Sequence, residues 1–289
     1  MIAAQFDYKV PKSLNEAVSL LAADPDGAKI LAGGHSLIPA MKLRLAQPQT
    51  LIDIARIKDL SYIREEGDQI LIGATTTHYQ IESSELLQRI CPLLPQCAAS
   101  IGDVQVRNKG TIGGSVAHSD PAGDWPAAVI ALRADLILTG PNGDRTVSAD
   151  DFFVDLLTTD LQPGEILREI RIKKSAGRFG QAYQKVRHPA SGFAVVGIAV
   201  SVSLKADGSC EAASIGVTGV GAKAYRAAAA EAALLNTTLD DAATSNAASK
   251  VCDGVDPNAD LYASGDYRCH LAQVHTRRAI GAAIEAARV

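Results

Sequence analysis

The chain has 289 residues, of which 47% are hydrophobic and 21% charged, a composition typical of a globular protein with one large or two ordinary domains. Its 28 lysine and arginine residues against 32 acidic ones give a formal net charge of −4, which argues against a general nucleic-acid binder, because such a protein presents a clustered basic face. No apolar run approaches the roughly 20 residues that span a bilayer, so we expect no membrane span.

Short extended runs alternate with helical patterns at the start of the chain. A helix is expected to begin at Ser36 as its cap, with Pro39 in the first turn, where a missing N–H is tolerated. The run Glu66–Gly67–Asp68 has the composition of a hairpin turn. The predicted elements are, in order, a strand over 28–33, a helix over 36–46, a strand over 50–54 and a hairpin over 60–74.

The middle of the chain is more helical. Residues 77–101 have a helical pattern that Pro92 and Pro95 are expected to break. A short helix follows over 123–134, with Asp124 as a plausible cap. The next residues predict a hairpin over 135–147, with its turn at 141–144, and a strand over 165–172.

A polar stretch over residues 173–180 follows this strand and indicates a domain boundary near 175–177. We therefore expect one domain over 1–176 and a second over 177–289. The second domain has three strand-like stretches followed by alanine-rich helices, which predicts an α+β fold with helices on one face of an antiparallel sheet. Those stretches are 181–187, 193–208 and 210–220, and the helices are 227–235 and about 268–288.

Two diglycine loops, "AGGHSL" and "TIGGS", are the main candidates for a binding site. A glycine-rich loop before a helix presents several backbone N–H groups at one point, which suits a phosphate. Ser36 adds a hydroxyl to the first loop, and the second has a hydroxyl at each end. Each loop is therefore a candidate for one phosphate of a diphosphate, although neither ends in the Gly-Lys-Ser/Thr of a P-loop. The alternative, that both are only tight turns, stays open on pattern alone.

A third glycine motif, "GVGAKA" over Gly219–Ala224, resembles a dinucleotide-binding fingerprint, and Asp240 and Asp241 follow at roughly the expected distance. That fold needs a second parallel strand ending near the acidic residue, and "NTTLDDAATSNAASK" contains no strand-like run. We therefore expect a turn at the end of a strand.

Three histidines are candidate ligands or acid–base groups. His35 and His118 follow the diglycine loops and are expected to line them, while His188 precedes a proline; no metal-ligand spacing links the three. Five scattered cysteines form no CxxC pair, which favours reduced, buried thiols and a cytoplasmic protein, with contact to the inner membrane face through a complex left open. The first residues lack the pattern of a secretory signal. No catalytic or metal-binding residue is expected.

Four segments carry a family resemblance. "AGGHSLIPAMKLRLAQP", "IGATTTH", "RNKGTIGGSVAHSDPAGDWPAAV" and "KVRHPASGFAVVGIAV" closely resemble the FAD-binding medium subunit of molybdenum-containing hydroxylases, nearest to aerobic carbon monoxide dehydrogenase and related to the flavin region of xanthine dehydrogenase. The likeness runs essentially end to end. It implies a two-part FAD-binding domain of the vanillyl-alcohol oxidase (PCMH) type and a C-terminal domain of three strands with helices.

The resemblance also implies which residues hold FAD. The two loops would bind its diphosphate, Asp124 its polar groups, and Leu167 and Lys185 would lie against or near it. Phe193 stands where the family commonly has a tyrosine over the flavin ring; phenylalanine keeps the stacking face and lacks the hydroxyl. The full set of expected cofactor-binding residues is Ala32, Gly33, Gly34, His35, Ser36, Leu37, Thr111, Ile112, Gly113, Gly114, Ser115, Asp124, Leu167, Lys185 and Phe193.

By the same resemblance the chain is an electron-transfer subunit. A large molybdopterin subunit would oxidise the substrate, a small subunit with [2Fe–2S] clusters would relay electrons to FAD, and NAD, a quinone or another acceptor would receive them. A dimer of such heterotrimers is expected. Two alternatives remain: a self-contained FAD oxidase or dehydrogenase of the same fold, and a scaffolding subunit that has lost its cofactor.

Overall fold

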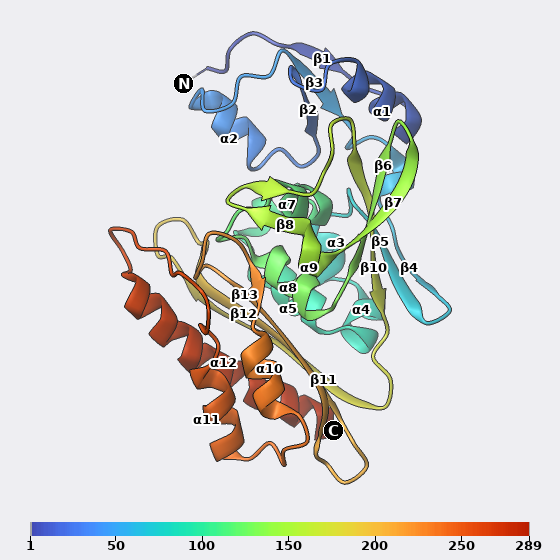
Figure 1. Cartoon of the computed structure of the whole chain (residues 1–289). Coiled ribbons are helices and arrows are strands. Elements are labelled where there is room, and N and C mark those ends of the chain that lie inside the picture. The colour runs from blue at the N-terminus through green and yellow to red at the C-terminus, as the bar shows by residue number, and fades with distance from the viewer. Residues whose placement is uncertain (1, 289) are drawn as a thin grey trace.

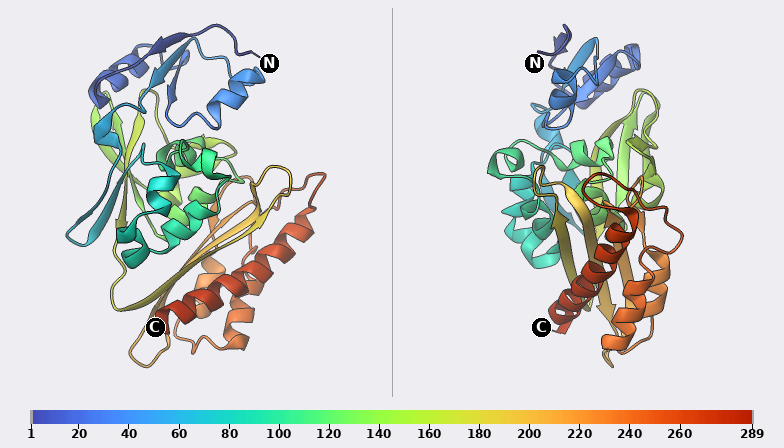
Figure 2. Two further views of the ribbon diagram at one scale, coloured as in Figure 1. Left: turned by 180° about the vertical axis from the view of Figure 1, so that it is seen from behind. Right: turned by 90° about the vertical axis from the view of Figure 1, so that its left-hand side faces the viewer.

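The structure, a computed structural model, describes residues 2–288 and has three layers along its length (Figures 1 and 2). The first is a small parallel sheet in the order β1-β3-β2, covered by two helices. Parallel strands need crossover connections, and each of the two helices lies within one of them. The elements are β1 (Asp7–Lys9), α1 (Leu14–Ala23), β2 (Ala28–Leu31), α2 (Leu37–Lys42) and β3 (Thr50–Asp53).

The second layer is a five-stranded antiparallel sheet in the order β4-β5-β10-β6-β7. Strand β10 comes from far along the chain and joins two hairpins that are sequential in the chain. The strands are β4 (Ile63–Glu66), β5 (Gln69–Gly73), β6 (Asp135–Gly140), β7 (Gly143–Ser148) and β10 (Ile166–Lys173), with the small pair β8 (Phe153–Asp155) and β9 (Thr158–Thr159) beside them.

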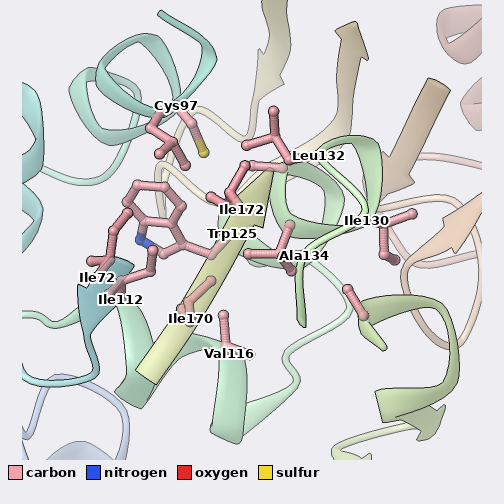
Figure 3. Close-up of a cluster of buried hydrophobic side chains, with 14 of the residues drawn as sticks. Ile72, Cys97, Ile112, Val116, Trp125, Ile130, Leu132, Ala134, Ile170 and Ile172 are labelled. Atoms are coloured by element: carbon pink, nitrogen blue, oxygen red, sulfur yellow. The ribbon is translucent and has the colours of Figure 1, made fainter. Parts of the chain in front are cut away.

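Short helices pack against this sheet around Trp125, which is fully buried (Figure 3). Their apolar side chains and those of β5 and β10 form one continuous core, which holds the loops between the helices in fixed positions. The helices are α3 (His78–Glu82), α4 (Glu85–Ile90), α5 (Leu93–Ala99), α6 (Val104–Arg107), α7 (Ile112–His118), α8 (Asp124–Ala131) and α9 (Ala149–Phe152), and a 3₁₀ turn, η1, spans Lys58–Leu60.

The third layer is an antiparallel sheet in the order β11-β12-β13-β14. The three expected strands are confirmed, and a fourth, two-residue strand adds to them. The helix α11 was not expected, and α12 begins three residues earlier than predicted. The elements are β11 (Arg178–Arg187), β12 (Ala194–Leu204), β13 (Cys210–Thr218), β14 (Tyr225–Arg226), α10 (Ala228–Leu234), α11 (Asp241–Ser249) and α12 (Gly265–Arg288).

This sheet is covered on both faces. The helix α12, red in Figure 1, crosses β11 and β12 on one face, while α8 packs on β12 and β13 from the other. Seven successive residues at the start of β12 are buried, the pattern of a strand with no solvent-facing side. The expectation of the chain's own C-terminal helices on one face is therefore correct, and the helical layer of the first half covers the other.

Several local expectations were wrong. Pro95 does not break a helix: it lies in the first turn of α5, where no N–H is required. Asp124 is the first residue of α8 rather than its cap, which is Gly123. Ser36 stands at the cap position of α2, as expected, but its side chain makes no capping hydrogen bond. The turn between β6 and β7 consists of residues 141–142 only.

The third glycine motif is a turn, as expected. Gly219 directly follows β13 with φ +86°, and Asp240 caps the helix α11 instead of ending a parallel strand. The expected domain boundary at 176/177 falls between the end of β10 and the start of β11 and stays a prediction.

Candidate functional site

A cavity of about 620 Å³ lies where the three layers meet. Both diglycine loops line it, together with β10, β11 and the loop that precedes β12. Of the fifteen expected cofactor-binding residues, all but Ile112 line this cavity. Ile112 belongs to the second loop, but its side chain is fully buried and points into the core around Trp125, so only its backbone could serve a ligand there (Figure 3).

The first loop has unused hydrogen-bond donors. The backbone N–H groups of residues 33–37 find no acceptor anywhere in residues 2–288. His35 and Ser36 are exposed, and unpaired N–H groups are usual at the start of a helix, so this row at the cavity wall is free to donate to a ligand with several acceptor oxygens. Gly34 supports this arrangement with φ +75°, a conformation that glycine adopts without strain.

The second loop differs from the expectation of an equivalent set of donors. Ile112 N–H donates to the Thr76 carbonyl and Gly113 N–H to the Ala74 carbonyl. Gly114 N–H donates to the Thr111 hydroxyl, the cap of α7, at 3.1 Å. The second loop therefore uses these N–H groups for bonds within the protein, while Gly113, Gly114 and Ser115 still line the cavity.

The two loops touch each other. A Cβ atom on Gly33 would lie 2.2 Å from the Lys109 carbonyl oxygen and 2.7 Å from the Gly110 Cα. Glycine at position 33 is therefore required for this contact between protein segments, and not only for approach of a ligand. The contact brings both loops to one end of the cavity.

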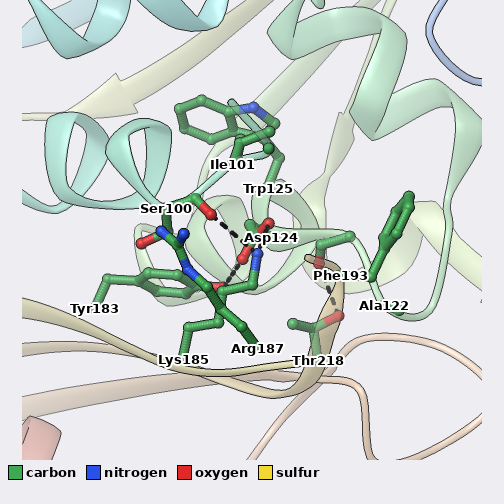
Figure 4. Close-up of polar contacts among 12 residues, drawn as sticks. Ser100, Ile101, Ala122, Asp124, Trp125, Tyr183, Lys185, Arg187, Phe193 and Thr218 are labelled. Atoms are coloured by element: carbon green, nitrogen blue, oxygen red, sulfur yellow. Dashed lines mark hydrogen bonds and ion pairs between the residues drawn. The ribbon is translucent and has the colours of Figure 1, made fainter. Parts of the chain in front are cut away.

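A buried ion pair stands on another wall of the cavity (Figure 4). Lys185 Nζ on β11 donates to Asp124 Oδ2 at 2.8 Å and to the Ser100 carbonyl at 3.1 Å. The Tyr183 hydroxyl donates to Asp124 Oδ1 at 2.5 Å. Burial raises the pKa of Asp124, and the Lys185 and Tyr183 hydrogen bonds oppose this effect. The carboxylate thus already has a donor on each oxygen.

An apolar strip completes the lining. Leu167 on β10 is buried, while Phe193 is 46% exposed and reaches the cavity from the loop between β11 and β12. Hydrogen bonds close this loop at its base, with His188 N–H donating to the Phe193 carbonyl at 2.8 Å. The His188 ring, expected to have no ligand role, packs on Tyr262.

The structure adds lining residues that the pattern did not reveal. Lys29 lies in the same segment as the first loop, and Ile101 and Gly102 in the short loop after α5. His78 ends the motif "IGATTTH", which carried part of the resemblance but was given no role. Glu165 is held by Arg145, whose guanidinium donates to both of its carboxylate oxygens at 2.7 and 2.8 Å.

The cavity thus offers donors at one end, an ion pair on one wall and apolar surface along its length, which suits a long ligand with an anionic part and a flat ring. His35 and His118 line it, as expected. Within residues 2–288, no group of three or more His, Cys, Asp or Glu side chains is arranged to hold a metal ion. Over the same residues, no helix combines the length and the apolar character needed to cross a bilayer.

Comparison with known families divides the chain in two. Residues 4–174 match the family described as the FAD binding domain in molybdopterin dehydrogenase. Residues 181–283 match the CO dehydrogenase flavoprotein C-terminal domain. The chain therefore carries an FAD-binding domain, and together the two matches cover most of its length.

Individual relatives agree with this assignment. The carbon monoxide dehydrogenase medium chain of Hydrogenophaga pseudoflava is 43% identical over 98% of each chain. The glyceraldehyde dehydrogenase medium chain of Sulfolobus acidocaldarius is 36% identical over 96% of this chain and 98% of its own. A solved structure of the Hydrogenophaga pseudoflava carbon monoxide dehydrogenase superposes with a TM-score of 0.96, at 45% identity over 99% of each chain. The chain belongs to the FAD-binding medium subunits of the molybdenum hydroxylases, the family that contains the carbon monoxide dehydrogenase medium chains.

Proposed function

We propose that this chain holds FAD in the cavity described above and acts as the electron-transfer subunit of its complex. The observation that carries the proposal is that one cavity gathers both diglycine loops and the buried Asp124–Lys185 pair. Its volume of about 620 Å³ lies within the range of roughly 300–1,000 Å³ that is usual for cofactor pockets.

The donors of the first loop fit a diphosphate. Five N–H groups without protein acceptors supply the positive end of several dipoles, and no side chain at Gly33 or Gly34 blocks the approach. The second loop has no free N–H donor at residues 112–114. Its backbone would instead pack closely against the same diphosphate. At Gly114 an added Cβ would meet only the Thr111 hydroxyl and, at 3.8 Å, Ala32.

The other walls would orient the remainder of FAD. Lys185 keeps its ammonium group at the cavity wall through Asp124 and the Ser100 carbonyl, so its positive charge is fixed beside the ligand. A fixed cation favours added negative charge on a nearby ring. Phe193 supplies an aromatic face, and Leu167 excludes water. When bound, FAD supplies the redox chemistry, while the protein supplies position and electrostatics.

This arrangement supports a role without substrate chemistry on this chain. Asp124, the one buried carboxylate at the cavity with a raised pKa, is committed to Tyr183 and Lys185 rather than available as a general base. We therefore propose that substrate is oxidised on a large molybdopterin subunit and that [2Fe–2S] clusters of a small subunit deliver electrons here, in a dimer of heterotrimers. NAD, a quinone or another external acceptor then takes them, and the location is the cytoplasm.

The test is a visible spectrum of the purified chain, alone and with its co-purifying subunits, followed by chromatography of the extracted flavin. We expect FAD, with little turnover of any substrate by the chain alone. Turnover of a small substrate by the isolated, FAD-loaded chain would instead favour the self-contained oxidase. Absence of flavin from both preparations would contradict the proposal and favour a scaffolding role.

A further inference from the structure

His78 occupies an unusual position between the core and the cavity. It is the first residue of α3, after the cap Thr77, and its backbone N–H donates to the Gly110 carbonyl at 3.0 Å. Its side chain is only 4% exposed, yet it lines the cavity beside the junction of the two diglycine loops. A side chain so placed contacts both the folded core and any occupant of the cavity.

The ring is held in one tautomer. The indole Nε1–H of Trp125, which has no acceptor capacity, donates to His78 Nδ1 at 3.0 Å. Nδ1 must therefore carry a lone pair, and the proton of the neutral ring lies on Nε2. Burial lowers the pKa of His78 to about 4, and the nearby His35 and Arg107 act in the same direction. The ring is thus neutral at physiological pH.

The Nε2 atom faces the place where the loops meet. A Cβ atom on Gly110 would lie 2.6 Å from Nε2, and Gly110 is the residue that Gly33 contacts. Nε2–H has no acceptor among residues 2–288. The Nε2 atom also keeps some accessible surface, unlike the fully buried polar atoms that lack a partner. Because His78 lines the cavity, and this N–H is uncharged and fixed in direction, it is available to donate to a ligand oxygen.

We propose that His78 is a cofactor-positioning residue, whose Nε2–H, fixed by Trp125, donates a hydrogen bond to an oxygen of the ligand at the junction of the two diglycine loops. This inference rests on the proposed function, since it takes FAD as the ligand. It assigns a role to the last residue of "IGATTTH" and explains why a buried histidine is paired with a tryptophan rather than with a carboxylate.

Fluorescence titration of the full-length chain with FAD tests the affinity. His78→Phe keeps a ring of similar size and removes the donor, so we expect the Kd to rise about tenfold. His78→Gln restores an N–H near the Nε2 position and should return the Kd to within about threefold of the wild-type value. His270→Phe, the same exchange at an exposed position of α12 outside the cavity, should leave the Kd unchanged.

An unchanged Kd in a folded His78→Phe protein overturns the inference and leaves the proposed function standing. Failure of the wild type to bind FAD, both as the chain alone and with its co-purifying subunits, overturns the inference and the proposed function together. A second measurement does not depend on the affinity: ¹⁵N NMR of the imidazole groups, with the His78 signals assigned by their absence from folded His78→Phe and confirmed with His78→Gln. We expect the Nε2–H tautomer between about pH 6 and 8 and a shift of Nε2 on adding FAD. The Nδ1–H tautomer, or no response to FAD, would overturn the inference.

Discussion

The two diglycine loops share a dipeptide and a cavity, but they use their backbone differently. In the first loop the glycines precede α2, and the N–H groups of residues 33–37 are unpaired within residues 2–288. In the second loop Gly113 and Gly114 lie in the first turn of α7, and their N–H groups bond to Ala74 and Thr111. The position of the glycines relative to the start of the helix therefore goes with whether the N–H groups of a loop stay free or bond within the protein.

The loops agree in the role of their first glycine. A Cβ atom on Gly33 would lie 2.2 Å from the Lys109 carbonyl, and one on Gly113 would lie 2.4 Å from the Cβ of Ala74. Both residues are small because protein lies against them. Shape is thus the common requirement of the two loops, and the free donors belong to the first loop alone.

The largest effect is expected from Gly33→Val. The added side chain meets the Lys109 carbonyl and must push the loops apart, and overpacking of this kind typically costs about 1–3 kcal/mol. FAD binding must then bring the loops back together against this cost. At about 3 kcal/mol the FAD affinity falls about 100-fold, so the purified protein should lose its flavin. The ratio of flavin to protein measures this loss, with circular dichroism to show that the C-terminal sheet stays folded.

Gly281→Val is the matched control for this exchange. Gly281 lies on α12, and an added Cβ would meet nothing within 4 Å, so flavin content should not change. A folded Gly33→Val protein with wild-type flavin content would refute the placement of the diphosphate at these loops.

A second prediction concerns the effect of His78, which packs beside Gly110 next to the second loop, on the free energy of unfolding at low pH. The pKa of His78 in the folded chain is about 4, below its ordinary value of 6.5, so between these values the unfolded chain binds a proton that the folded chain does not. This residue therefore lowers the free energy of unfolding as the pH falls from about 6.5 toward 4, by up to about 3 kcal/mol. Above about pH 6.5 the loss is absent. Urea unfolding of the wild type and His78→Phe at several pH values measures it.

The difference in unfolding free energy between these two proteins should shrink by that amount as the pH falls, since phenylalanine does not titrate. His270→Phe should show no such convergence, because His270 is exposed. A difference between wild type and His78→Phe that stays constant from pH 7 to 4 would mean that the ring is not buried as a neutral group.

Much of the fold was predictable because local patterns carried it. Alternating and apolar runs located the strands of both antiparallel sheets, and glycine-rich turns located the hairpins. The short α11 was missed because its sequence "DAATSNAAS" has little amphipathic pattern and is held in place by packing against α10 and α12. The strand β14 has two residues, too few for any periodicity.

The site was predictable where the glycines and the resemblance pointed to it, and less so where tertiary contacts decide. Nothing local shows that Asp124 is paired with Tyr183 and Lys185, since some 60 residues separate them. The same holds for His78 and Trp125, 47 positions apart. The unused donors of a loop were also not predicted from its sequence, because the acceptors that pair the N–H groups of "TIGGS" include the carbonyls of Ala74 and Thr76, far from it in the chain.

The finest test exchanges one hydroxyl in each loop. Thr111 caps α7 by accepting from Gly114 N–H, so Thr111→Ala should lower the free energy of unfolding by about 1 kcal/mol. Ser36 makes no capping bond, so Ser36→Ala should leave stability within about 0.5 kcal/mol of the wild type but weaken FAD binding about fivefold, by loss of a donor at the cavity. Urea unfolding and FAD titration of both variants measure the two effects. Equal losses of stability in the two variants would show that the loops are built alike, because only a self-supporting loop depends on its own hydroxyl to stay folded.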